Sequence, residues 1–97
     1  MSGEKSREPS RAAAALLTRM RRSAVGWSSA DFQRLYLGCG FVMRERGDHT
    51  VYYHPRHAWL RASVPRHREL RAWVAREAVA LIEELLRLQE AEHEQGH

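Results

Sequence analysis

The chain has 97 residues, 43% of them hydrophobic, so it has room for one small core and no second domain. It contains no apolar run near the roughly 20 residues that cross a bilayer, and Met1 to Ser10 lacks the apolar stretch of a secretory signal. We therefore expect a soluble, cytoplasmic protein with no membrane partner. The single cysteine, Cys39, excludes an internal disulfide and is interpreted as a small buried residue rather than a reactive thiol.

The net charge of +4 is unevenly distributed along the chain. Residues 1–27 carry six Lys or Arg against two acids, residues 28–68 carry seven against three, and residues 69–97 carry three against seven. The basic character therefore belongs to the N-terminal and central parts, where four of the six histidines also lie. This distribution favours an anionic partner such as a phosphate backbone, although many arginine-rich surfaces serve only solubility.

Residues 1–26 are predicted to form a basic tail and an extra helix outside the main domain. The sequence RAAAALLTRMRR, from Arg11 to Arg22, consists of strong helix formers, with Ser10 available as an N-cap and a basic last turn. Because this segment has only three sizeable apolar side chains, we expect the helix to pack on a surface or on a partner rather than to form the main core.

The main domain is expected to span residues 27–89 and to begin with a short helix. Ser28 and Asp31 have the spacing of a capping box at a helix start. Apolar residues then follow at helical intervals, namely Phe32, Leu35 and Tyr36. The helix is predicted to end at the sequence Gly-Cys-Gly, because Gly38 or Gly40 can adopt the left-handed conformation that a helix C-terminus favours.

Three short antiparallel strands are predicted next, over residues 41–46, 49–54 and 58–64. Gly47 and Asp48 form a tight turn between the first two strands. In the third strand, every second residue is apolar, and Pro65 ends it.

Residues 69–89 predict the longest helix, which we expect to cover the sheet. Its apolar side chains recur at three- and four-residue steps, and Trp73 and Ile82 widen the apolar stripe. Residues 90–97 are predicted to form a frayed acidic tail. The predicted fold is an α+β domain with the element order α-β-β-β-α, a three-stranded antiparallel sheet and an extra N-terminal helix.

No established metal or nucleophile motif is present, and we expect neither a metal nor a cofactor. The zinc candidates lack the paired spacing of a structural site; they are Cys39, His49, His54, His57 and His67. The sequence Gly-Cys-Gly follows a helix instead of opening one, which argues against a phosphate-binding loop. No serine stands with a histidine and a carboxylate in a known nucleophile motif.

The sequence leaves two interpretations of His49 open. A histidine at a strand start after Gly-Asp is most often a turn residue with a satisfied side chain. Histidine is, however, the residue type best suited to proton transfer near neutral pH, and His49 has Arg44 and Arg46 on the neighbouring strand, which is a familiar arrangement for proton transfer at a phosphodiester. Asp48 either orients His49 or raises its pKa, or only shapes the turn.

The run from Trp27 to about Leu86 resembles the HicA-type toxins, the small mRNA interferases of type II toxin-antitoxin systems. Members of that family begin with a short helix that ends before a Gly-Phe pair, here Gly40-Phe41. They then carry a hairpin with Gly-Ser-His and an apolar-aromatic strand, here GDHTVYYHP. A third strand that ends in Val-Pro precedes the last helix, here SVPRHRELRAWVAREAVALIEEL.

The resemblance implies a fold like that of double-stranded-RNA-binding domains. It also implies RNA cleavage that depends on the histidine of the Gly-Ser-His motif, which corresponds to His49, and neutralisation by a HicB-like antitoxin. The chain departs from the family pattern at Asp48, which replaces the usual serine. This departure places a negative charge where an RNA phosphate would approach.

The leading hypothesis is a metal-independent endoribonuclease in which His49 is the general acid or base and the RNA 2′-hydroxyl is the attacking group. The candidate phosphate-binding residues are Arg44, Arg46, Arg61, Arg66 and Arg68. One alternative is a non-catalytic RNA-binding module of the same fold. The other is a protein-interaction domain that uses the N-terminal helix and the helix from Trp73 to Leu88 in an oligomer.

Overall fold

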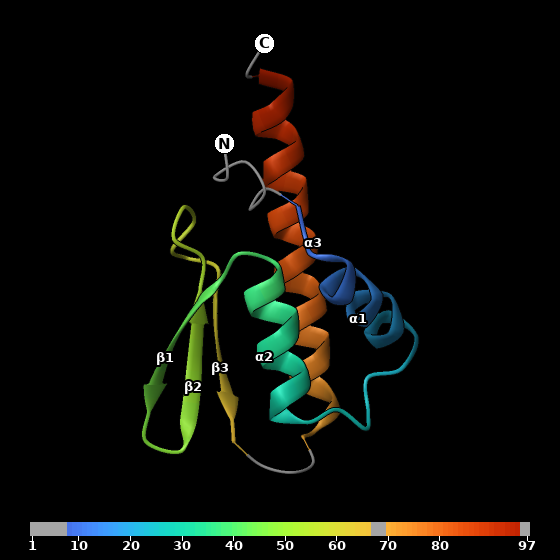
Figure 1. Ribbon diagram of the computed structural model, residues 1–97, viewed down its shortest axis with the longest axis vertical. Coiled ribbons are helices and arrows are strands. Elements are labelled where there is room, and N and C mark those ends of the chain that lie inside the picture. Colours follow the sequence, from blue (N-terminus) through green and yellow to red (C-terminus); the bar gives the residue numbers. More distant parts are fainter. Residues whose placement is uncertain (1–7, 67–69, 96–97) are drawn as a thin grey trace.

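The computed structural model describes residues 8–66 and 70–95, which form three helices and one three-stranded sheet (Figure 1). In chain order, the elements are α1 (Arg11–Arg22), α2 (Ser29–Gly38), β1 (Val42–Arg46), β2 (His49–Tyr53), β3 (Arg61–Pro65) and α3 (Ala72–Gln95). The predicted α+β class is confirmed, with the order α-β-β-β-α after an extra N-terminal helix. Within the described ranges, no helix has both the length and the apolarity needed to span a bilayer.

The strands form an antiparallel sheet in the order β1-β2-β3, so β1 and β3 are its edges. Gly47 and Asp48 connect β1 to β2, as predicted, and Gly47 has a φ of +62°. A positive φ at the first of two turn residues is typical of a type II′ turn, which glycine adopts without strain. The side chains of β2 alternate, so Thr50 and Tyr52 are buried while their neighbours point to the other face.

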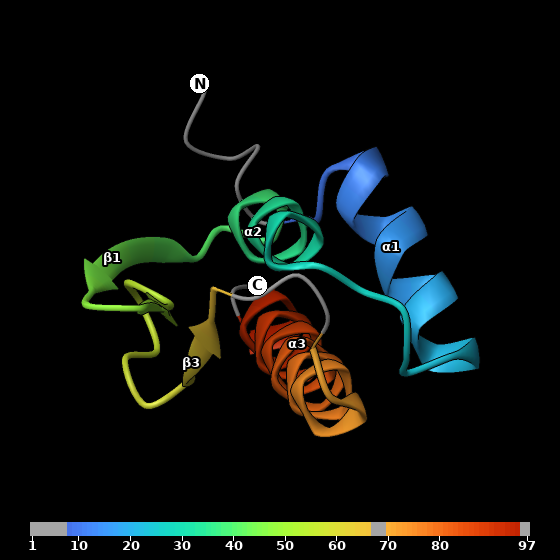
Figure 2. The same cartoon turned by 90° about the horizontal axis from the view of Figure 1, so that it is seen from below.

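The helices lie on one side of the sheet. Figure 2 shows α2 and α3 between the sheet and α1, so that the molecule has three layers. Both α2 and α3 contact β3, and α2 also contacts β1. Within the described residues, no helix lies on the opposite face of the sheet (Figures 1 and 2).

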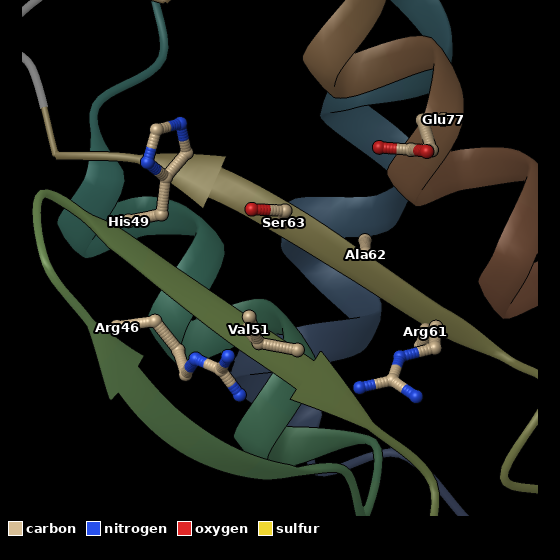
Figure 3. A pocket seen from close by; sticks show the side chains of 7 residues that line it. All are labelled: Arg46, His49, Val51, Arg61, Ala62, Ser63 and Glu77. Atoms are coloured by element: carbon tan, nitrogen blue, oxygen red, sulfur yellow. The ribbon is translucent and has the colours of Figure 1, made fainter.

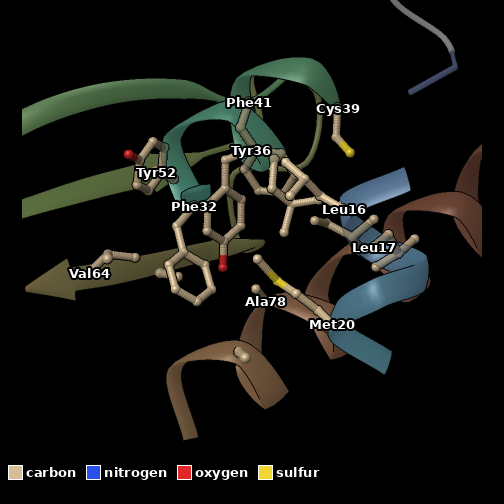
Figure 4. Packing of buried hydrophobic residues seen from close by; sticks show 14 of the residues in the cluster. Leu16, Leu17, Met20, Phe32, Tyr36, Cys39, Phe41, Tyr52, Val64 and Ala78 are labelled. Atoms are coloured by element: carbon tan, nitrogen blue, oxygen red, sulfur yellow. The ribbon is translucent and has the colours of Figure 1, made fainter. Parts of the chain in front are cut away.

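The core is centred on aromatic rings between α2 and the sheet (Figure 4). Tyr36 of α2 stacks on Tyr52 of β2 with ring centroids 4.6 Å apart, and Phe41 meets Tyr36 edge-on at 5.0 Å. Such pairs contribute about 0.5–1.5 kcal/mol beyond the burial of their area. Other large buried side chains fill the space around them, namely Phe32, Leu35, Val64, Val74, Ile82 and Leu85.

The N-terminal helix α1 is part of this core, so the expectation of a surface or partner helix was wrong. Four of its side chains are buried in the same cluster, namely Ala13, Leu16, Leu17 and Met20. Small residues at the contact between α1 and α2 make this burial possible. Gly38 of α2 has no Cβ, and one built there would lie 2.7 Å from the Cβ of Ala13. The two helices therefore approach so closely that a few apolar groups suffice to bury their interface.

Both ends of α2 have the capping interactions that the sequence predicts. The Ser28 hydroxyl accepts a hydrogen bond from the Asp31 backbone N–H, and the Asp31 carboxylate accepts one from the Ser28 N–H. At the other end, Gly40 has a φ of +90°, and the Phe41 N–H donates to the Tyr36 carbonyl at 3.0 Å. This pattern is a Schellman motif, which ends the helix.

The third strand starts later than predicted. β3 begins at Arg61 rather than at residue 58, because the backbone before it closes a turn: the Leu60 N–H donates to the His57 carbonyl at 2.8 Å. The alternation within the strand is as predicted, with Ala62 and Val64 buried.

The last helix differs from its prediction at both ends. α3 continues to Gln95, so the prediction of a frayed tail was wrong for residues 90–95. Its last turns have partners in the loop before β3, since the Glu92 carboxylate lies 3.4 Å from His57 Nε2 and 3.9 Å from Arg56. Trp73, expected in the apolar stripe, is 50% exposed in the first turn of α3. α3 begins at Ala72, so the predicted helix was wrong at Leu70 and Arg71, and the predicted first residue, 69, lies outside the described residues.

The burial of α1 predicts the effect of truncating one of its side chains. Leu17→Ala should lower the free energy of unfolding by about 2–5 kcal/mol, because it removes a buried side chain and leaves a cavity. Urea denaturation measures this change. Leu37→Ala on α2 is the control, since Leu37 is 41% exposed and its truncation should cost about 0.5 kcal/mol or less. Equal small effects for the two variants would mean that α1 is a surface appendage.

Candidate nucleic-acid interface

The uncovered face of the sheet carries a set of residues that the strand register brings together. Arg46 pairs with His49, and Arg44 pairs with Val51. On the other side of β2, Val51 pairs with Ser63 and Tyr53 with Arg61. Because directly paired residues point to the same face, all of these side chains lie together. We call this surface the basic sheet face and define it by Arg44, Arg46, His49, Val51, Tyr53, Arg61 and Ser63.

Three guanidinium groups on the basic sheet face lack an acidic partner. Arg44, Arg46 and Arg61 are exposed, and within residues 8–66 and 70–95 none of their guanidinium groups makes an ion pair or hydrogen bond. Guanidinium groups without a carboxylate partner attract anions and bind phosphate oxygens in a bidentate manner. The uncovered face is therefore suited to a phosphate backbone.

The basic sheet face contains two adjoining hollows. The larger has a volume of about 510 Å³ and is lined by residues of all three strands and by Glu77 of α3 (Figure 3). His49 and Arg61 lie toward its two ends, and the side chain of Val51 lies between them (Figure 3). The smaller hollow, of about 230 Å³, shares Arg46, Val51 and Arg61 with it. The surface is thus continuous from His49 to the far end of β2.

The imidazole of His49 is held by its neighbour Asp48. His49 Nδ1 lies 2.9 Å from Asp48 Oδ1, and the His49 side chain is 45% exposed. A carboxylate accepts hydrogen bonds only, so this contact keeps a proton on Nδ1 and leaves Nε2 of the neutral ring with a free lone pair. The turn therefore orients His49 so that Nε2 can accept a proton from a bound molecule.

The five predicted phosphate-binding arginines do not have equivalent surroundings. Arg66 pairs with the Glu45 carboxylate at 3.1 Å, and its guanidinium also donates to the Gly47 carbonyl. Its backbone N–H donates to the Asp48 carbonyl at 3.0 Å. Arg66 thus fastens the turn that carries His49, and its charge already has a partner. Arg68 lies outside the described residues.

The other histidines and Cys39 do not form a metal site in the described part of the chain. No group of three or more potential ligands is close enough there to hold an ion. His54 and His57 are buried instead, and the ring of His54 packs edge-on against Phe41. Burial raises the pKa of the Cys39 thiol to about 12, which is consistent with a buried, unreactive side chain. His67 lies outside the described residues.

Sequence analysis missed Val51, Tyr53 and Ser63 of the basic sheet face, and also Glu77, which lines the larger hollow. The alternation of β2 contained the signal for Tyr53, because residues 49, 51 and 53 must share a face once residues 50 and 52 are buried. Ser63 follows in the same way from β3. Glu77 has no local signal, since only the packing of α3 beside β3 brings it to the hollow. Burial raises the pKa of its carboxyl.

Comparison of the chain with protein-family models, with curated proteins and with solved structures gives no match. The resemblance to the HicA-type toxins therefore rests on the motifs of the sequence alone. The geometry of the basic sheet face is an independent basis for a functional proposal.

The buried histidine predicts how stability depends on pH. Burial lowers the pKa of His54, the charges of His57 and Arg56 lower it further, and Glu92 opposes them. Below about pH 6.5 the unfolded chain therefore takes up a proton at this histidine more readily than the folded protein does. The free energy of unfolding should thus decrease as the pH is lowered. Melting curves between about pH 7.5 and pH 5.5 measure this loss.

His54→Asn is the control for that measurement. An asparagine can still accept the hydrogen bond that the Arg56 N–H donates to His54 Nδ1, but it does not titrate. The loss of stability between the two pH values should be smaller in this variant than in the parent. An identical loss in both proteins would assign the pH dependence to other groups.

Proposed function

We propose that this protein is an endoribonuclease similar to the HicA-type toxins, acting on mRNA in the cytoplasm and neutralised by a HicB-like antitoxin. The observation that carries the proposal is His49, whose ring is held by Asp48 on a surface with three guanidinium groups that lack acidic partners. A base for proton transfer and cations for a phosphodiester thus lie on one face of the sheet. The motifs that resemble the HicA-type hairpin support the same assignment.

The proposed reaction uses the 2′-hydroxyl of the RNA as the nucleophile. His49 Nε2 takes the proton of this hydroxyl, whose oxygen attacks the adjacent phosphorus. Arg46 and Arg61 stabilise the additional negative charge on the phosphoryl oxygens. The bond to the 5′-oxygen then breaks, and this oxygen takes a proton from the imidazolium or from water. The expected products are a 2′,3′-cyclic phosphate and a 5′-hydroxyl, and no metal ion takes part.

A non-catalytic RNA-binding module is the second candidate, and Asp48 is the observation that favours it. Its side chain is 81% exposed beside His49, where its charge opposes the approach of a phosphate. The same carboxylate orients the imidazole, so its two effects on cleavage have opposite signs. Measurements of binding and of cleavage on one RNA distinguish the two candidates.

The protein-interaction alternative loses most of the surface that motivated it. The apolar side chains of α1 are buried against α2 and α3 within one chain, as are Val74, Ala78 and Leu85 of α3. They are therefore not available to a second copy. Trp73 is the large apolar side chain of α3 that stays exposed.

Replacing the histidine tests the proposed mechanism. His49→Ala should lower the single-turnover rate of RNA cleavage by about 10²-fold to 10⁴-fold, because it removes the group that transfers the proton. The melting temperature should barely change, since the side chain is half-exposed and lies outside the core. Cleavage by the parent protein should continue in EDTA, and its products should include a cyclic phosphate.

His93→Ala is the matched control, because His93 is an exposed histidine near the end of α3, away from the β1–β2 turn (Figure 1). Its rate should equal that of the parent. His54 is unsuitable for this purpose, since its burial against Phe41 makes His54→Ala destabilising. Asp48→Ser should lower the rate if the orientation of His49 by Asp48 matters more than the repulsion between Asp48 and the phosphate. The loss should then be smaller than that of His49→Ala. A His49→Ala protein that cleaves normally would remove His49 from the mechanism.

The salt dependence of binding tests the role of the arginines. Raising the salt from about 50 to about 200 mM should weaken RNA binding about 20-fold, which is the effect expected when three cations engage a single strand. Arg61→Gln should weaken binding and lower the slope of log affinity against log salt by about 0.7. Arg87→Gln is the control, because Arg87 pairs with Glu84 on the surface of α3. Equal slopes for the parent and Arg61→Gln would exclude Arg61 from the interface.

A further inference from the structure

Tyr53 presents an aromatic ring on the basic sheet face. It is the last residue of β2 and lines the smaller hollow together with Arg44 and Arg61. The side chain is half-buried, and within the described ranges it makes no aromatic, cation–π or hydrogen-bond contact. Tyr52, the preceding residue, is fully occupied in the core by its stacking on Tyr36. The ring of Tyr53 is thus available to a bound molecule.

We propose that Tyr53 is the stacking platform for one base of a single-stranded RNA. This inference rests on the function proposed above and assigns its substrate class. Aromatic side chains on sheet faces and in basic grooves bind single strands by stacking on bases, while nearby cations hold the backbone. Arg44 and Arg61 flank Tyr53 on the two neighbouring strands and supply these cations.

The position of Tyr53 relative to His49 fixes where this base lies along the RNA. Tyr53 and His49 are on the same face of β2 and four residues apart, which corresponds to about 13 Å. An extended single strand covers this distance in about two nucleotides. The stacked base therefore belongs to a nucleotide about two positions from the phosphodiester that is cleaved at His49.

A duplex does not fit this arrangement. The bases of an A-form helix are paired and stacked on one another, and the helix presents phosphates and 2′-hydroxyls to a protein. An aromatic ring on the central strand, between two edge strands, reaches a base only after that base has left the stack. The aromatic ring and the two hollows along β2 are thus suited to one extended strand.

The first test is the affinity for a short labelled 2′-O-methyl RNA, which has no 2′-hydroxyl for the proposed reaction. Tyr53→Ala should bind it about tenfold more weakly than the parent, and Tyr53→Phe should bind as the parent does, because stacking needs the ring and not the hydroxyl. Val25→Ala is the control, since Val25 is exposed between α1 and α2 and lines neither hollow. Melting curves of the variants check that the fold is retained.

The second test locates the base. In a cleavable RNA, the nucleotides around the cleaved bond are replaced one at a time by abasic residues. One replacement, about two positions from that bond, should slow cleavage by the parent and have no further effect on Tyr53→Ala. This coupling between one nucleotide and one side chain is a double-mutant cycle, which a general loss of stability would not produce.

The possible outcomes separate this inference from the proposed function. A parent protein that neither binds nor cleaves RNA would overturn the proposed function. A parent that binds and cleaves RNA, while Tyr53→Ala binds equally well or a duplex of the same sequence binds more tightly, would overturn only the stacking platform. Weaker binding by Tyr53→Ala, retained binding by Tyr53→Phe and coupling to a single nucleotide would support it.

Discussion

The stacking of Tyr36 on Tyr52 decides which face of the sheet meets solvent. The 4.6 Å separation of their rings holds one side of β2 against α2, and strict alternation then turns residues 49, 51 and 53 outward. A slip of one residue in the register would exchange the two sets of side chains. The same contact that builds the core therefore also places the histidine and the outward tyrosine on the open face.

The turn between β1 and β2 is a second constraint on the site, and it acts through the backbone. Gly47 provides the positive φ, and Arg66 closes the turn by binding the Gly47 and Asp48 carbonyls and the Glu45 carboxylate. The guanidinium of Arg66 is thereby a structural group, unlike those of Arg44 and Arg46. Two kinds of arginine thus lie in or beside this hairpin, and only their surroundings distinguish them.

Local physics made much of the fold predictable from the sequence. The capping box of Ser28 and Asp31 and the tight turn at Gly47 and Asp48 each have a signal in adjacent residues of the sequence. The burial of α1 was not predictable in this way, because it depends on the absence of a side chain at Gly38, far along the chain. The extra turns of α3 likewise depend on Arg56 and His57 in another loop. In the site, His49 and three of its arginines followed from the strand pattern, whereas Glu77 required the packing of α3.

The arginines of β1 have a consequence for the behaviour of the protein at high concentration. β1 is an edge strand whose outer backbone groups are not paired within the sheet, and such an edge can recruit the edge of another molecule. Its side chains include the charges of Arg44, Glu45 and Arg46, which oppose this association. The cations that we propose to bind RNA therefore also oppose edge-to-edge pairing between molecules, and removing both of them should favour that pairing.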